Sequence, residues 1–134
     1  MKTLKKLRTD HPGRGPHTLT GPIFVNGAEA GDILKVKLKR IVPRSYATDF
    51  NIPGIFGQFP KDFQYGQVKF LYLDTVRKVT EYSPGIEILL NPFPGTLGGA
   101  RAQPGHYSSV PPGEISGNMD ILDFVEGTTL YVPV

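Results

Sequence analysis

The stretch that decides the fold begins at residue 91 and ends at residue 120. It opens with Asn91-Pro92-Phe93-Pro94-Gly95-Thr96-Leu97-Gly98-Gly99-Ala100 and closes with Val110-Pro111-Pro112-Gly113-Glu114-Ile115-Ser116-Gly117-Asn118-Met119-Asp120. Proline lacks a backbone donor and glycine has a flexible backbone, so a stretch this rich in both forms neither a helix nor a central strand. It also carries apolar anchors that a disordered linker lacks, namely Phe93, Leu97, Val110, Ile115 and Met119. We therefore predict a long ordered loop that forms part of an active or binding site.

The segments around this loop have the pattern of short strands. In residues 33–41, Leu34, Val36 and Leu38 alternate with lysines, which is typical of a strand with one buried and one solvated face. We also expect a strand ending near Val25, one in residues 67–79 with a second after a tight turn at Asp74, and further strands in residues 86–90 and 128–134. The turn signals are Asn26-Gly27, Ser83-Pro84-Gly85 and Glu126-Gly127. No window has a clean helical period, so we predict a mainly β chain, sandwich-like or barrel-like, with long ordered Gly/Pro-rich loops and little helix.

Two local features have alternative interpretations. Residues 43–66 are dense in aromatic side chains without a regular period, and they form either a lid or subunit-contact loop or the closure of the domain's own core. Asp32, in a Gly-Asp step before the strand in residues 33–41, is expected to cap backbone donors of a turn.

Composition limits the domain count and the classes of function. A chain of 134 residues with 39% hydrophobic and 20% charged residues is one ordinary domain, and 16 Gly with 13 Pro indicate many turns. The net charge of +3 comes from an N-terminal cluster of Lys2, Lys5, Lys6, Arg8 and Arg14. We predict a solvated basic arm in residues 1–16 followed by a β domain in residues 17–134, and no nucleic-acid partner.

The absence of cysteine excludes disulfides, thiolate metal ligands and a cysteine nucleophile. No apolar run is long enough to span a bilayer and no signal peptide is recognisable, so we expect a cytoplasmic protein without a membrane partner. The last apolar strand ends directly at Pro133-Val134 without a polar tail, from which we expect the chain to be a piece of something longer.

The candidates for catalytic, binding or metal-ligating residues are polar residues on turns. They are His17, Thr18, Thr20, His106, Ser108, Ser109, Glu114, Asn118 and Asp120. Asn118 and Asp120, two apart, would point the same way on an extended backbone and offer an amide and a carboxylate to one ligand, although Asp120 has the alternative of a turn cap. Each histidine is either a metal ligand or base or a structural residue. The serines are nucleophiles only with a base in reach, and Glu114 with Asp120 would suit acid–base work or a hard cation.

Three motifs in one order resemble the acetamidase/formamidase family. Residues 17–32, His-Thr-Leu-Thr-Gly-Pro-Ile-Phe-Val-Asn-Gly-Ala-Glu-Ala-Gly-Asp, are similar to that family's His-Pro-Leu-Thr-Gly-Pro-Ile-Tyr-Val-Glu-Gly-Ala-Glu-Pro-Gly-Asp. The loop resembles its Pro-Phe-x-Gly-x-x-Gly segment followed by Pro-Pro-Arg-Glu-Asn-Gly-Gly-Asn-Met-Asp, and residues 127–134 resemble its Gly-Ser-x-Leu-Tyr-Leu-Pro-Val. The departures include Gly113, Ile115 and Ser116, where the family has Arg, Asn and Gly.

The resemblance implies hydrolysis of a short aliphatic amide to a carboxylate and ammonia, assisted by a divalent metal for which zinc is a candidate. It implies catalytic roles for Asp120, Asn118 and His17, substrate contacts from Glu114, Thr20 and Gly117, and metal ligation by Asp120 and His17. It also implies a homo-oligomer and longer relatives, whose Gly-Asp-x-His segment after the Pro-Val strand would come here from a second chain or a missing segment. The alternative is a noncatalytic β-rich binding or structural module that needs a second chain.

Overall fold

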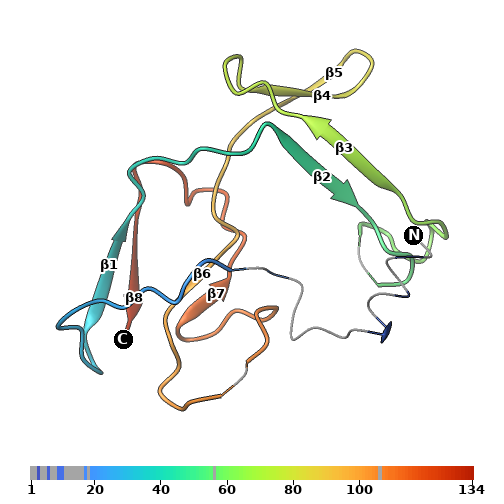
Figure 1. The fold of residues 1–134 in the computed structure, drawn as a ribbon. Coiled ribbons are helices and arrows are strands. Elements are labelled where there is room, and N and C mark those ends of the chain that lie inside the picture. Colours follow the sequence, from blue (N-terminus) through green and yellow to red (C-terminus); the bar gives the residue numbers. More distant parts are fainter. Residues whose placement is uncertain are drawn as a thin grey trace. The chain divides into compact units, whose positions relative to one another are not determined.

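The computed structural model describes residues 3, 6, 9, 10, 17, 19–55, 57–105 and 107–134. The chain divides into two compact units, each of which is described by itself. The first unit comprises Met1–Pro12 and Val42–Asn91, and the second comprises Gly13–Ile41 and Pro92–Val134. The described strands pair as four two-stranded antiparallel ladders, β1 with β8, β2 with β3, β4 with β5, and β6 with β7 (Figure 1). The predictions of a mainly β chain with ordered loops and little helix are confirmed.

The first unit contains β2 (Tyr46–Phe50), β3 (Val68–Tyr72), β4 (Val79–Ser83) and β5 (Ile86–Leu89). The tight turn predicted at Asp74 is present, because the Asp74 carboxylate accepts hydrogen bonds from the backbone N–H groups of Val76 and Arg77 at 3.0 and 2.8 Å. The turn delivers Val79 and Thr80 to buried positions, where the Thr80 hydroxyl donates to the carbonyl of Tyr72 at 2.7 Å. The predicted Ser83-Pro84-Gly85 turn joins β4 to β5, with Gly85 at a φ of 78°.

Strand β2 lies inside the aromatic segment and was not predicted. It forms because Tyr46, Thr48 and Phe50 pair with Tyr72, Phe70 and Val68 and share one face of the β2–β3 ladder. The aromatic side chains on this face are exposed, as are Phe59, Phe63 and Tyr65 of the segment that follows β2. The described rings named here are therefore exposed within this unit, and both interpretations of residues 43–66 stay predictions.

The second unit is built on β1 (Ile33–Lys37) and β8 (Thr129–Pro133), which lie side by side in Figure 1. Leu34 pairs with Val132 and Val36 with Leu130, and these positions are more buried than the lysines between them. The predicted alternation is thus confirmed, with the strand ending at Lys37 rather than at Ile41. Val132 is only 1% exposed and Phe124 6% exposed, and they form the core of this unit.

Two further expectations need correction. The strand predicted to end near Val25 does not form, since Pro22 has no donor for a ladder and Ile23 and Phe24 are 80% and 88% exposed. The turn at Asn26-Gly27 that follows is present, with Gly27 at a φ of 77°. The loop in residues 91–120 is not wholly irregular, because it contains β6 (Thr96–Gly98) and β7 (Ser116–Asn118).

The N-terminal arm falls mainly outside the described residues. Of residues 1–16 the structure describes four, among which the Lys6 ammonium and the Asp10 carboxylate form an exposed ion pair at 2.6 Å. In the described part of the chain, no helix has the length and apolar character needed to cross a membrane.

The burial of Val132 generates a stability prediction. Val132→Ala should lower the free energy of unfolding by about 2 kcal/mol, because it removes apolar surface from the best-buried position of the β1–β8 ladder. Val76→Ala is the matched control, since Val76 is 92% exposed and the same change should stay within about 0.5 kcal/mol. Urea denaturation measures both variants, and equal effects would contradict the assigned core.

Candidate functional site

The candidate site is built on the ladder between β6 and β7. Thr96, Leu97 and Gly98 pair with Asn118, Gly117 and Ser116, and the Gly99 N–H donates to the Ile115 carbonyl at 3.0 Å. The two strands approach so closely at Gly98 that a Cβ there would lie 2.8 Å from the Ile115 carbonyl oxygen. Glycine is required at this point, and the ladder closes residues 99–115 into a loop, hereafter the closed loop.

The His17 side chain contacts the side chain of Ser109, which belongs to the closed loop. The His17 Nδ1 lies 2.9 Å from the Ser109 hydroxyl oxygen, and both residues are partly buried. When the ring proton is on Nε2, Nδ1 accepts a hydrogen bond from the hydroxyl. An imidazole of the kind that a serine nucleophile would need as its base therefore lies next to Ser109. Ser108 has a different role, since its hydroxyl accepts a hydrogen bond from the Val110 N–H at 3.2 Å.

Asn118 holds the segment that carries Ser109. Its Nδ2 donates to the Val110 carbonyl at 3.0 Å, and its Oδ1 accepts from the Thr96 hydroxyl at 3.4 Å. The amide thus ties β7 to the residue after Ser109 and to β6. His17, Ser109 and Asn118 belong to one connected group of contacts within the second unit.

Asp120 lies beyond the end of β7, on a backbone that is not extended. Strand β7 ends at Asn118 and Asp120 has a φ of 47°, so the expectation that an extended backbone aligns Asn118 with Asp120 is wrong. The Met119 and Asp120 N–H groups instead both donate to the Gly95 carbonyl, at 2.9 and 3.2 Å. The Asp120 Oδ1 lies 2.7 Å from where a Cβ on Gly95 would be, so the carboxylate rests against Gly95. Asp120 as a residue is exposed.

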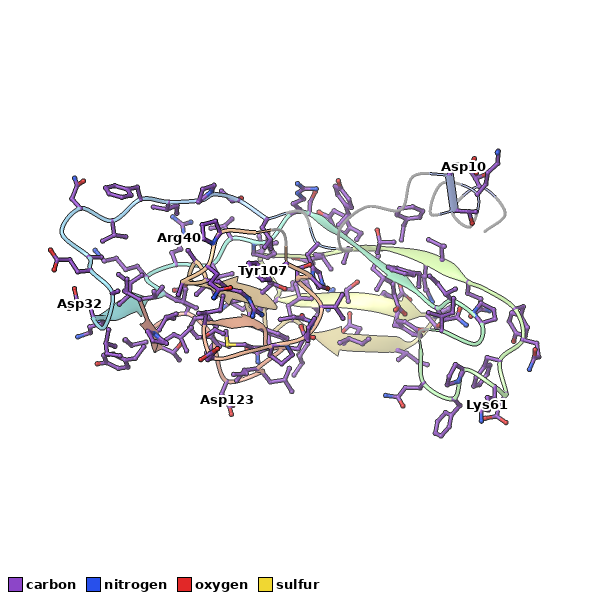
Figure 2. The ribbon with its side chains drawn as sticks, turned by 90° about the horizontal axis from the view of Figure 1, so that it is seen from below. Asp10, Asp32, Arg40, Lys61, Tyr107 and Asp123 are labelled. Atoms are coloured by element: carbon purple, nitrogen blue, oxygen red, sulfur yellow. The ribbon has the colours of Figure 1, made fainter. Side chains whose placement is uncertain are left out.

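The remaining predicted residues are less constrained. Thr20 and Glu114 are exposed, and Gly117 has a φ of 117°, which favours glycine there. Thr18 and His106 lie outside the described residues. Asp32 accepts the Glu29 N–H at 3.0 Å in the turn before β1, as predicted, and is labelled at that turn in Figure 2.

The described residues do not by themselves form a metal site. Among them, no group of three or more His, Asp and Glu side chains is placed to hold a metal ion. The Nδ1 of His17 faces Ser109 and the Asp120 carboxylate faces Gly95, in two different surroundings.

Sequence reasoning missed the roles of Gly95, Thr96 and Val110. They act through backbone or side-chain contacts with Asp120 and Asn118, and those contacts depend on the β6–β7 register, which no local pattern encodes.

Comparisons with known proteins identify the family of this chain. The family model described as the acetamidase/formamidase family matches residues 10–106. The structure is similar to the crystal structure of an acetamidase from Bacillus halodurans, with 30% identity, a TM-score of 0.75 and 85% of this chain covered. It is also similar to a recombinant predicted acetamidase/formamidase from the thermophile Thermoanaerobacter tengcongensis, with 30% identity, a TM-score of 0.78 and 86% covered.

The chain spans 37% of the length of each of these two structures. The comparison with curated proteins found no match. Because the family model covers more than half of the sequence, the chain belongs to the acetamidase/formamidase family.

The contact between Asp120 and Gly95 is testable without an activity assay. Gly95→Ala should push the Asp120 carboxylate aside, since its Cβ would lie only 2.7 Å from Oδ1, and should destabilise the protein by about 1 kcal/mol. The amide signals of Met119 and Asp120 should shift in a ¹H–¹⁵N spectrum. Gly113→Ala, whose Cβ would meet Arg101 Nη2 at an ordinary 3.6 Å, should leave both signals in place. Unmoved signals in the Gly95 variant would show that the contact is absent.

Proposed function

We propose that this chain contributes to an amidohydrolase that converts short aliphatic amides, such as formamide and acetamide, to a carboxylate and ammonia. Membership of the acetamidase/formamidase family is the observation that carries the proposal. The acetamidase from Bacillus halodurans, at 30% identity, supports the same reaction class. Within the chain, support comes from a hydroxyl and an imidazole in hydrogen-bond contact, Ser109 and His17, and from the exposed Asp120 on a separate turn of the same unit.

The reaction needs a group that moves protons. The amide carbon must gain an oxygen nucleophile, and the amine must gain a proton before it leaves as ammonia. We assign this transfer to His17, whose Nδ1 accepts the proton of the Ser109 hydroxyl as that oxygen attacks, and then returns it to the nitrogen. A water molecule then attacks the acyl ester in the same manner, releasing the carboxylate and restoring Ser109.

The other residues bind and orient. We propose that the Asp120 carboxylate orients the hydrolytic water, since it is exposed on a turn fixed by the Gly95 carbonyl. Asn118 acts mainly by holding the segment of Ser109 through the Val110 carbonyl. Glu114, Thr20 and Gly117 are assigned to substrate contact, and backbone N–H groups of the glycine-rich turns to the tetrahedral oxyanion.

Further elements of the proposal concern the complete protein. A divalent cation such as zinc, held by Asp120, would require ligands beyond the described residues. His17 would be a ligand through Nε2 only if another group took its role as the base, because a metal on Nε2 leaves the ring proton on Nδ1. Such a cation, when bound, would supply positive charge for the developing oxyanion. We also propose that a second chain or a further segment completes the site, that the assembly is a homo-oligomer, and that it acts in the cytoplasm.

Ammonia release tests the proposal. Formamide and acetamide are supplied to this chain alone and to the chain with any co-purifying partner, and we expect hydrolysis by the completed assembly but not by the chain alone. If neither sample releases ammonia, the amidase proposal fails and the noncatalytic module remains.

Asp120→Asn isolates the charge of Asp120. Asparagine has the same shape and tolerates the φ of 47° better than alanine does, so folding should be preserved while ammonia release is lost. Asp123→Asn is the matched control, because the Asp123 side chain is exposed and points away from the ribbon in Figure 2. Retained turnover in the Asp120 variant would remove Asp120 from the mechanism.

His17→Asn tests proton transfer. The asparagine amide can reach the place of Nδ1 and keep a hydrogen bond to Ser109, but it cannot carry a proton between atoms. The rate of ammonia release should fall about 10²–10⁴-fold with little change in thermal stability. A smaller effect than that of Ser108→Ala, which removes only a turn hydrogen bond, would contradict the assignment.

A further inference from the structure

One face of the β2–β3 ladder is both the more apolar and the more exposed of the two. This face, hereafter the aromatic face, consists of three cross-strand pairs, Tyr46 with Tyr72, Thr48 with Phe70, and Phe50 with Val68. All six residues are exposed, the two phenylalanines by 53% and 74% and the two tyrosines by 53% and 73%. The solvated face of an antiparallel ladder normally carries polar side chains, so the usual arrangement is reversed here.

The opposite face of the ladder contacts the rest of the first unit. The Lys69 Nζ lies 3.9 Å from the centroid of the Tyr82 ring and donates to the Ser83 hydroxyl at 3.3 Å, so β3 meets β4 on this side. Ala47 and Leu71, which pair on the same face, are half-buried. Because side chains alternate between the two faces of a strand, these contacts direct the aromatic residues of β3 away from β4. The aromatic face is therefore exposed within the described part of its unit.

The size of the aromatic face matches one half of a protein–protein interface. An aromatic side chain can bury about 150–250 Å², so four of them, each more than half exposed, offer roughly 500 Å² of aromatic surface. Two such faces in contact would bury on the order of 1,000 Å², the lower bound for a specific interface, and Thr48 and Val68 add to this area. A single apolar patch of this size is at the upper end of what monomers expose.

The distribution of charge favours a second copy of this chain as the partner. The six residues of the aromatic face are uncharged, so two identical faces can meet without opposing like charges. The charged residues of the two strands, Asp49 and Lys69, pair on the opposite face. Interfaces between identical subunits are also more apolar than other interfaces, and aromatic residues are enriched at interface centres.

We propose that the aromatic face is the surface through which two copies of this chain associate. The contact is isologous, with each aromatic face packed on the same face of the other copy. A two-fold axis along the strands sets β3 of one copy over β2 of the other, so that Phe70 lies over the smaller Thr48 of the partner subunit. The inference rests on the proposed function only for the homo-oligomer, whose contact surface it locates, and it is independent of the amidase reaction.

Phe70→Lys tests this association. Sedimentation equilibrium of the full wild-type chain should give twice the monomer mass of 14.7 kDa, with a Kd in the micromolar range or tighter. Phe70→Lys should raise that Kd about thirtyfold or more, because each dimer would then bury two ammonium groups at the centre of the interface. Thr48→Lys, which removes no ring, should act in the same direction. Val76→Lys is the matched control, since Val76 is exposed in the same unit outside β2 and β3, and it should leave the Kd unchanged.

The possible outcomes are distinguishable. A wild-type chain that stays at the monomer mass at every concentration would overturn the inference and leave the aromatic face to another polypeptide. Equal effects of Val76→Lys and the two ladder variants would also overturn it. So would a lower melting temperature of Phe70→Lys with an unchanged mass, because the ring would then pack within its own chain. Absence of ammonia release from an intact dimer would instead count against the amidase proposal alone.

Discussion

The close approach of β6 and β7 is the constraint on which the candidate site depends. The absence of a side chain at Gly98 lets the Ile115 carbonyl and the Gly117 N–H come within 3.0 Å of the position a Cβ would take. The ladder sets Thr96 opposite Asn118, and Asn118 in turn fixes the Val110 carbonyl beside Ser109. The same register brings the Gly95 carbonyl to the N–H groups of Met119 and Asp120. Moving β7 by one residue would turn Asn118 to the other face and break every one of these contacts.

In this arrangement, some polar residues hold the site together through hydrogen bonds, and others have side chains that could take part in a reaction. Both ends of the Asn118 amide are engaged in hydrogen bonds, so Asn118 is a positioning residue for the closed loop. His17 and Ser109 contact each other from segments far apart in the sequence, and Asp120 is exposed. Because the polar groups lie on turns anchored by a short ladder, the site can be precise although the elements that carry it are small.

The sequence predicted what depends on local pattern. The alternation of Leu34 and Val36 with lysines identified β1, and the dipeptides at Asn26-Gly27 and Pro84-Gly85 identified turns. It missed β2, because Tyr46–Phe50 has no apolar–polar alternation of its own and the strand is defined by its pairing with Val68–Tyr72. It also treated residues 91–120 as one loop, since Thr96–Gly98 and Ser116–Asn118 are too short and too glycine-rich to have a strand pattern of their own. Strand pairing across twenty residues is a property of the fold, and the contacts of Asn118 and Asp120 follow from it.

Backbone strain gives an independent reason to regard β7 as functional. Ser116 has a φ of 73° and Asp120 a φ of 47°, so two of the four described non-glycine residues with positive φ lie at or just beyond the ends of a three-residue strand. Asp tolerates the left-handed region because its short polar side chain can bond locally, whereas Ser has less of this compensation, and such positions cost of order 1 kcal/mol or more each. Glycine at 116, which the family motif has, would remove this cost. This chain has serine at position 116, where the motif has glycine, and Ser116 still exchanges backbone hydrogen bonds with Gly113. The backbone geometry that positions Asn118 is therefore present although the residue at 116 differs from the motif. The site therefore depends on the conformation of β7 together with the amide side chain of Asn118, and less on which residue stands at position 116.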